Sequence, residues 1–243
     1  MTHFRLAVKT RNRSRRQETF KEKSERAMAI AAHLARTYPE LKVPLAHRNT
    51  FELLVAVILS AQCTDQAVNR VTPELFRRYP DPGALAQAST AEIERIIRPL
   101  GLFRAKSWSL KKCARQLVKQ FSGRVPATMA ELTRLAGVGR KTANVMLGHA
   151  FGKPGIIVDT HCKRLARRLE LSAEEDPEKI ETELNRLLPP REWTAFSHRL
   201  IIHGRVVCHA RNPACAHCVL NDLCPSSESS SQSGQTPPRP GKK

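Results

Sequence analysis

Four cysteines lie close together near the C-terminus, and they limit how this chain can fold because one short segment must accommodate all four thiols. The N-terminus carries no apolar stretch typical of a signal peptide, so an oxidising compartment is not indicated. In a reducing compartment, such a group favours a metal or cluster site over two disulfides. The spacing alone fits a zinc ion or a cubane iron–sulfur cluster equally well. The segment reads Cys208-x6-Cys215-x2-Cys218-x5-Cys224.

The charge of the chain favours a polyanionic partner. Lys and Arg number 41 against 22 Asp and Glu, a formal net charge of +19. Nucleic acid and an anionic membrane surface are the two candidates. The longest apolar run, Leu53–Leu59, is far shorter than the roughly 20 residues that cross a bilayer, so we expect no membrane insertion. Aromatic residues make up only 5%, which argues against a protein that stacks single-stranded bases. Nucleic acid is therefore the expected partner.

The apolar residues repeat with helical spacing, and no convincing strand alternation is present, so the predicted fold class is all-α. Ser89 with Glu92, and Thr128 with Glu131, fit the capping-box pattern that starts a helix. Only 155–158 is locally strand-like, and it is too short to build a sheet. Helices are predicted over 23–37, 51–62, 104–121, 140–151, 160–171, 176–188 and 192–207.

Both ends of the sequence differ in composition from the middle. Residues 1–25 are basic and lack apolar periodicity, which predicts a disordered arm that adds salt-sensitive affinity for DNA. Two other interpretations stay open: an upstream start codon, with Met28 near the true beginning, or an organellar transit peptide. Residues 226–243 are rich in Ser and Pro and are predicted to be disordered.

A tight glycine turn between two predicted helices is the sharpest local motif. It reads Gly137-Val138-Gly139-Arg140, and two glycines permit positive φ and a close approach of the backbone to a ligand. The turn opens directly into a helix whose first N–H groups have no intrahelical partner and favour an anion. With this net charge we interpret the hairpin as a site for DNA phosphate. An ordinary helix–helix turn is the alternative.

Lys141 and Asp159 are the candidate catalytic residues. Lys141 lies in the first turn of the helix after the hairpin, where the helix dipole disfavours a cation, and a neutral lysine is a nucleophile. Local sequence alone favours a solvated lysine that contacts phosphate. Asp159 follows a Gly/Pro loop and a short apolar run and precedes a basic helix, which it is placed to cap. An acid there can also stabilise the cationic sugar that forms when a glycosidic bond breaks.

Two segments resemble the endonuclease III branch of the helix-hairpin-helix DNA glycosylases. The segment 135–145 with Val158-Asp159-Thr160-His161 resembles that family's hairpin and Gly/Pro-Asp motif, and 59–65 resembles the endonuclease III branch. The resemblance covers about residues 26–225. It implies two helical domains with duplex DNA bound between them: a six-helix domain over 44–153, and a cluster domain formed by 26–43 and 154–225.

The resemblance also implies the roles of the site residues. Lys141 would form a Schiff base with C1′ of an oxidised pyrimidine nucleoside, and β-elimination would then cut the strand, with Asp159 as the essential acid. Gln62 would fill the gap left by the flipped base, and Leu102 would act as a wedge, although local sequence favours a core leucine. The four cysteines would hold a [4Fe–4S] cluster. The DNA contacts implied or predicted are Gln62, Leu102, Gly137, Val138, Gly139, Arg140, Thr160, His161 and Arg211.

Some features depart from the family pattern or leave alternatives open. Ala136 stands where the family usually has proline, and Arg211 is the only full positive charge between Cys208 and Cys215. A DNA-binding protein without catalysis would share the hairpin and the metal site, and a glycosylase using Asp159 and water would not cut the strand.

The chain is expected to act as a monomer inside the cell with the DNA, in bacterial cytoplasm or nucleoid.

Overall fold

The computed structural model describes residues 18–227, and every regular element within them is a helix. The predicted all-α class is confirmed. Among these residues no helix is long and apolar enough to cross a membrane. The elements in chain order are α1 (Phe20–Thr37), α2 (Thr50–Leu59), α3 (Asp65–Arg78), α4 (Pro82–Gln87), α5 (Thr90–Ile97), η1 (Arg98–Leu100), α6 (Phe103–Phe121), α7 (Met129–Leu132), α8 (Arg140–Phe151), α9 (Thr160–Arg168), α10 (Pro177–Leu187), η2 (Pro190–Glu192), α11 (Trp193–Val206), η3 (Cys215–His217) and η4 (Asn221–Leu223).

Side chains of polar residues start seven of the eleven α-helices in the described part of the chain by satisfying backbone N–H groups of the first turn. At α1, Thr19 and Glu22 form a complete capping box. This start corrects one prediction, because residues 20–25, assigned to the basic arm, are helical; the rest of the predicted arm, 1–17, lies outside the described residues. A second prediction is also wrong: Ser89 precedes α5 but its side chain makes no capping hydrogen bond.

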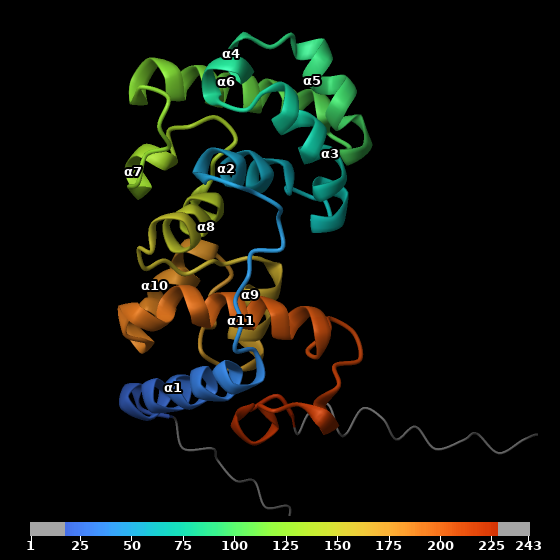
Figure 1. Ribbon diagram of the computed structural model, residues 1–243. Helices are drawn as coiled ribbons and strands as arrows, with labels where there is room; N and C mark the ends of the chain where they lie inside the picture. The colour runs from blue at the N-terminus through green and yellow to red at the C-terminus, as the bar shows by residue number, and fades with distance from the viewer. Residues whose placement is uncertain (1–17, 228–243) are drawn as a thin grey trace, which may run out of the picture.

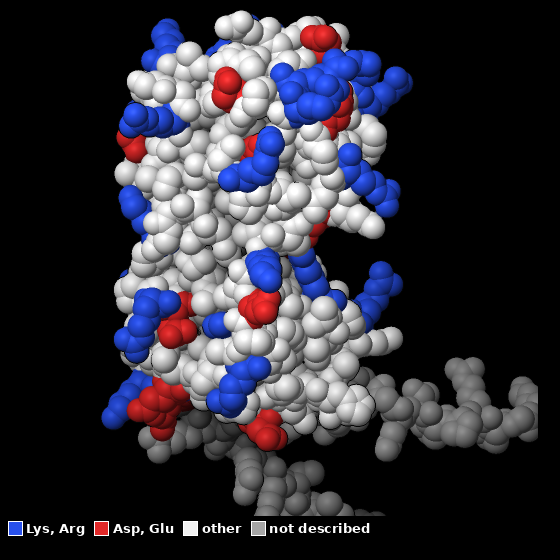
Figure 2. Space-filling model, in the orientation of Figure 1, with Lys and Arg blue, Asp and Glu red and all other residues white. Residues whose placement is uncertain are grey.

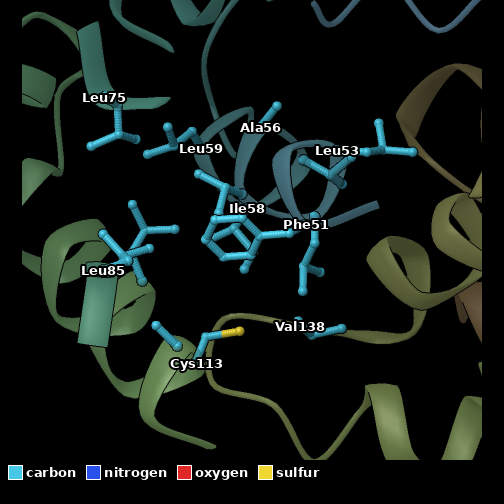
Figure 3. Packing of buried hydrophobic residues seen from close by; sticks show 14 of the residues in the cluster. Phe51, Leu53, Ala56, Ile58, Leu59, Leu75, Leu85, Cys113 and Val138 are labelled. Carbon is cyan, nitrogen blue, oxygen red and sulfur yellow. The ribbon is translucent and has the colours of Figure 1, made fainter. Parts of the chain in front are cut away.

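The first hydrophobic core is built around α2. All but the first residue of α2 are buried, because other helices surround it, and α3, α6 and α8 each pack against it. Phe51 lies in the middle of this core with Ile58, Leu85, Cys113 and Val138 around it (Figure 3). The buried residues of this cluster run from Leu45 to Leu147 along the chain.

A second core joins the two ends of the chain. Buried residues of α1 pack with those of α9, α10 and α11, so the N-terminal helix lies with the C-terminal helices (Figure 1). The segment 38–49 leads from α1 to α2, and α8 and the following loop return the chain to the second core. The two cores give two helical domains, as predicted for the fold class. Of the predicted tail, only 226 and 227 are described.

Candidate active site and cluster site

The glycine turn that precedes α8 is shaped by its contacts with the first core. Gly137 has φ +78°, and an ideal Cβ there would lie 3.0 Å from Ser109 Cβ and 3.1 Å from Ile58 Cγ2. Both the positive φ and the close neighbours therefore require glycine. Val138, predicted as a DNA contact, has a buried side chain, and its N–H donates to the Leu135 carbonyl at 3.1 Å.

Gly139 differs from Gly137 because it is open to its surroundings. It is the N-cap of α8, no atom lies within 4 Å of an ideal Cβ, and no side chain caps the first turn. The first N–H groups of α8 are thus available to a ligand at a surface that a second backbone can approach. The guanidinium of Arg140 is not available to a ligand in the same way, because Glu181 accepts from its Nε at 2.7 Å and its Nη2 at 3.1 Å.

Lys141 is exposed on the first turn of α8. Its amine makes no hydrogen bond or ion pair with any other residue in 18–227. The side chain instead lines a cavity of about 400 Å³ between the two domains. In Figure 2 the surface is hollowed at its right-hand edge, between α3 above and the end of α11 below. Lys and Arg side chains stand at the lower margin of this hollow.

The loop 152–159 carries Asp159 to the same cavity and is fixed on both sides. Asn144 of α8 is buried and donates from Nδ2 to the Ile156 carbonyl at 2.7 Å. From α11, Ser197 Oγ accepts from Ile157 N–H at 3.0 Å, and Thr194 Oγ1 accepts from Gly155 N–H at 3.2 Å. The apolar run 156–158 is buried. The loop is therefore held between α8 and α11 by its own backbone groups.

Asp159 ends this loop as the N-cap of α9. Its Oδ1 accepts from the N–H groups of His161 at 2.8 Å and Cys162 at 2.9 Å, so the predicted capping role is confirmed. The carboxylate also lines the cavity that Lys141 lines. Thr160 is exposed beside it, and Arg164 Nη2 lies 3.1 Å from His161 Nδ1. Two residues 18 positions apart in the sequence thus face one cavity.

Gln62 and Leu102 lie on two loops with strained backbones. Gln62 has φ +56° and Leu102 has φ +46°, a region that non-glycine residues rarely occupy. Gln62 lines the cavity, and the Leu102 side chain is 58% exposed, which rules out the core position that local sequence favours. Lys106 connects the loops: its buried Nζ donates to Cys63 Sγ at 2.9 Å and to the Leu100 carbonyl at 3.3 Å.

Several cavity residues carry no local sequence pattern, and sequence reasoning missed them. His149 of α8 and His198 of α11 meet edge to face on its wall. Asp65 at the start of α3 pairs with Arg205 at the end of α11, with Arg205 Nη1 2.9 Å from the carboxylate. This ion pair links the two domains beside the cavity. These residues meet because α8 packs against α11 and because the Asp65–Arg205 pair joins α3 to the end of α11.

The four clustered cysteines line a second cavity, of about 320 Å³, below α9. Donors surround their sulfurs: Arg168 Nη1 lies 3.1 Å from Cys208 Sγ, and Leu220 N–H lies 3.4 Å from Cys218 Sγ. The carbonyls of His209 and Ala210 accept from the same Arg168 at 2.7 and 2.9 Å.

This arrangement fits the predicted cluster. Four thiols share one cavity wider than a single ion, and N–H donors to the sulfurs stabilise thiolates that hold iron. Burial raises the pKa of the Cys218 and Cys224 thiols, and the neighbouring cysteines add to this shift. His203 is buried, with its Nε2 3.3 Å from Cys218 Sγ and its Nδ1 3.0 Å from Tyr38 Oη. Both ring nitrogens thus have partners, and the ring contacts the sulfur of Cys218. His209, His217 and Arg211 are exposed.

Comparisons with known proteins agree with this architecture. Residues 55–190 match the family model of HhH-GPD superfamily base excision DNA repair proteins, and residues 208–224 match the iron-sulfur binding domain of endonuclease III. Endonuclease III of Synechocystis sp. is 49% identical over 209 residues, which cover 86% of this chain and 95% of the relative. Endonuclease III of Bacillus subtilis is 43% identical over 77% of this chain and 86% of its own length.

A solved structure of a non-covalent endonuclease III–DNA complex matches with a TM-score of 0.82 at 39% identity, over 86% of this chain and 98% of that chain. A trapped endonuclease III–DNA covalent intermediate matches equally well. The fold and the two sites therefore define a base-excision DNA repair protein of the helix-hairpin-helix superfamily. Within it, the chain belongs to the endonuclease III family. Members of that family are DNA glycosylases with abasic-site lyase activity and a [4Fe–4S] cluster. The predicted class of enzyme and the predicted cofactor are therefore confirmed.

Proposed function

We propose that this chain removes oxidised or ring-saturated pyrimidines from duplex DNA and then cuts the strand at the abasic site. The observation that carries the proposal is the single cavity that Lys141 and Asp159 share between the two domains, with Gln62 at its edge. A base must leave the helical stack before its glycosidic bond can be attacked, and the cavity is the place for the extruded nucleotide. Its volume of about 400 Å³ lies within the range typical of small-ligand pockets.

Lys141 is the proposed nucleophile. Its neutral amine attacks C1′, the bond from C1′ to the base breaks, and the base departs with the electron pair and gains a proton. The amine gives up one proton, the C1′–O4′ bond breaks with its electron pair going to O4′, which gains a proton, and the nitrogen lone pair closes the C1′ iminium, the Schiff base. Loss of a proton from C2′ then breaks the C3′–O bond, which is the β-elimination that cuts the strand. No described neighbour holds the Lys141 amine, which leaves it free to reach the sugar.

Asp159 is the proposed acid beside this centre. Two N–H groups hold its Oδ1, so the carboxylate is fixed where it lines the cavity. A fixed anion there stabilises the positive charge that develops on the sugar, and it can take the proton from the attacking amine. The same hydrogen bonds that cap α9 thus orient the catalytic group.

DNA binding is proposed to use the hairpin and the two strained loops. The uncapped N–H groups after Gly139 suit a phosphate, and the exposed Leu102 suits a wedge between base pairs. Gln62 would occupy the gap left by the flipped nucleotide. Thr160, His161 and Arg211 remain proposed contacts, whereas Arg140 would contribute through its backbone because Glu181 holds its guanidinium.

The [4Fe–4S] cluster is proposed to be held by Cys208, Cys215, Cys218 and Cys224 and to be structural, since four thiolates leave no iron open to a substrate. Its ligands would fix the loop that presents Arg211. The domain boundaries proposed are 44–153 for the hairpin domain, and 26–43 with 154–225 for the cluster domain. The chain would act as a monomer with the DNA inside the cell.

The test is borohydride trapping on duplex DNA that contains thymine glycol or an abasic site. Wild type should form a covalent adduct with both substrates, and Lys141→Ala should form none, with strand cleavage lowered on the order of a thousandfold or more. Lys119→Ala, which changes an exposed lysine of α6 that does not line the cavity, is the matched control and should behave like wild type.

Each rival function gives a different result. Release of the base without cleavage or adduct would replace this proposal with a glycosylase that uses Asp159 and water. Binding to DNA without base release would leave a DNA-binding protein. The broad visible absorbance of an iron–sulfur protein, absent from a zinc protein, checks the cluster independently.

A further inference from the structure

Two histidines form one wall of the active-site cavity, and the proposed chemistry uses neither. His149 comes from α8 and His198 from α11, so each of the two helices that hold the loop 152–159 contributes one ring. The ring centroids are 4.9 Å apart and the planes meet at 89°, an edge-to-face contact of the kind that fixes aromatic rings. The pair therefore has a defined orientation before any ligand enters.

His198 has a polar atom that the protein leaves unsatisfied. The residue is only 8% exposed, and its Nδ1 is buried with no hydrogen-bond partner in the part of the chain that the structure describes. Nor does its Nε2 bond to any residue within 18–227. Buried polar atoms are nearly always paired, and an exception calls for a ligand or another explanation. Because this ring lines the cavity, a molecule bound there is the nearest source of a partner.

The surroundings of both rings favour the neutral imidazole, because they lower the pKa of each below its ordinary value. Burial, together with the neighbouring His198 and His47, lowers the pKa of His149 to about 4. Burial also lowers the pKa of His198, with Arg205 and Arg199 acting in the same direction. A neutral imidazole carries one N–H donor and one acceptor nitrogen. The wall thus suits a neutral ligand that has both carbonyl oxygens and N–H groups.

We propose that His198, held in place by His149, is a specificity-determining residue that hydrogen-bonds the flipped pyrimidine base in this cavity. The inference rests on the proposed function, since it takes the cavity to be the place of the extruded nucleotide. An oxidised pyrimidine is neutral and alternates carbonyl oxygens with an imide N–H along one edge, which matches what a neutral imidazole offers. A residue that binds the base contributes to its excision but has no contact with a sugar that has lost its base.

The experiment compares two substrates in single turnover: duplex DNA containing thymine glycol, and the same duplex with a preformed abasic site. His198→Leu keeps a similar volume and removes both nitrogens, and it should slow excision of thymine glycol about tenfold or more, the effect of removing one hydrogen bond to the base. Cleavage at the abasic site should stay within about twofold of wild type. His198→Gln, which restores a donor and an acceptor, should recover most of the excision rate.

His33→Leu on α1, outside the cavity, is the matched control and should change neither rate. Equal reduction on both substrates, or no reduction on either, would overturn the proposal, because the ring would then be structural or out of contact with the base. If His198→Leu does not fold, the same comparison made with His198→Gln decides. Excision of thymine glycol and cleavage at the abasic site lowered by the same large factor in His198→Gln would count against the proposal. Failure of the proposed function itself is distinguishable, because wild type would then give no borohydride adduct at the abasic site.

Discussion

At Gly155 the backbone passes so close to Asn144 that a methyl group has no room. An ideal Cβ would lie 2.7 Å from Asn144 Oδ1, and Asn144 is buried and holds the Ile156 carbonyl. Gly155→Ala should therefore lower the free energy of unfolding by about 1–3 kcal/mol and shift the loop that ends in Asp159. Thermal unfolding together with single-turnover excision measures both effects.

The control for Gly155→Ala is Gly139→Ala, where no atom lies within 4 Å of an ideal Cβ and φ is −91°. This variant should keep its melting temperature. An unchanged melting temperature in Gly155→Ala would mean that Asn144 moves aside at no cost and that the loop is held by α11 alone.

Single residues also show what the sequence can and cannot predict. The cap at Asp159 is predictable because a helix cap is a local pattern, and its hydrogen bonds to residues two and three positions later confirm it. Leu102 is ambiguous in sequence because its exposure depends on which loop packs over it, and only the family resemblance favours the wedge. His149 and His198 escape prediction because their contact depends on how α8 and α11 pack, which no local spacing encodes.

At the scale of helices, periodicity predicts their positions well but their caps less well. The predicted helices over 140–151 and 104–121 begin within a residue of α8 and α6. Ser89 fits a capping box in sequence, yet Glu92 lies within 3.4 Å of Tyr79 Oη instead, because the packing of α3 against α5 offers it another partner. Tertiary contacts thus override a local signal at this helix start.

The attachment of α9 to the cluster loop gives a prediction about an element. Arg168 donates to Cys208 Sγ and to two carbonyls of the following residues, at 2.7 to 3.1 Å. Arg168→Ala should leave these acceptors unpaired, destabilise the loop by about 1–3 kcal/mol, and speed the loss of the cluster's visible absorbance in a chelator. The control is its neighbour Arg167→Ala, because among residues 18–227 the Arg167 side chain pairs only with exposed Glu175. This substitution should change stability by less than about 1 kcal/mol. Equal rates of cluster loss in the two variants would show that α9 does not hold the loop.

The whole molecule depends on a contact between the two ends of its sequence. Helix α1 packs into the second core with α10 and α11, and Arg26 of α1 donates to the Leu169 carbonyl at 2.7 Å. Periodicity predicts that α1 is a helix, but not which core it joins, because that depends on contacts more than a hundred residues apart. The family resemblance supplies this pairing, and it places the cavity between the domains as well.

Net charge is a property of the whole chain, and it gives the last prediction. Residues 1–17 contain six Lys and Arg and no acid, so the chain shortened to 18–243 keeps 35 basic against 22 acidic residues, a net charge of +13. This shortening preserves the Thr19 cap and the Glu18–Arg26 ion pair, so the fold should be unchanged.

If the basic segment neutralises phosphates, removing it should make the slope of log affinity against log salt shallower by about 0.9 for each phosphate that it neutralises, up to about 5. The measurement is the dissociation constant for an abasic-site duplex at several salt concentrations, with melting temperature as the control for folding. Identical slopes for the full and shortened chains would instead favour a targeting segment or a start at a later methionine, since neither requires residues 1–17 to touch DNA.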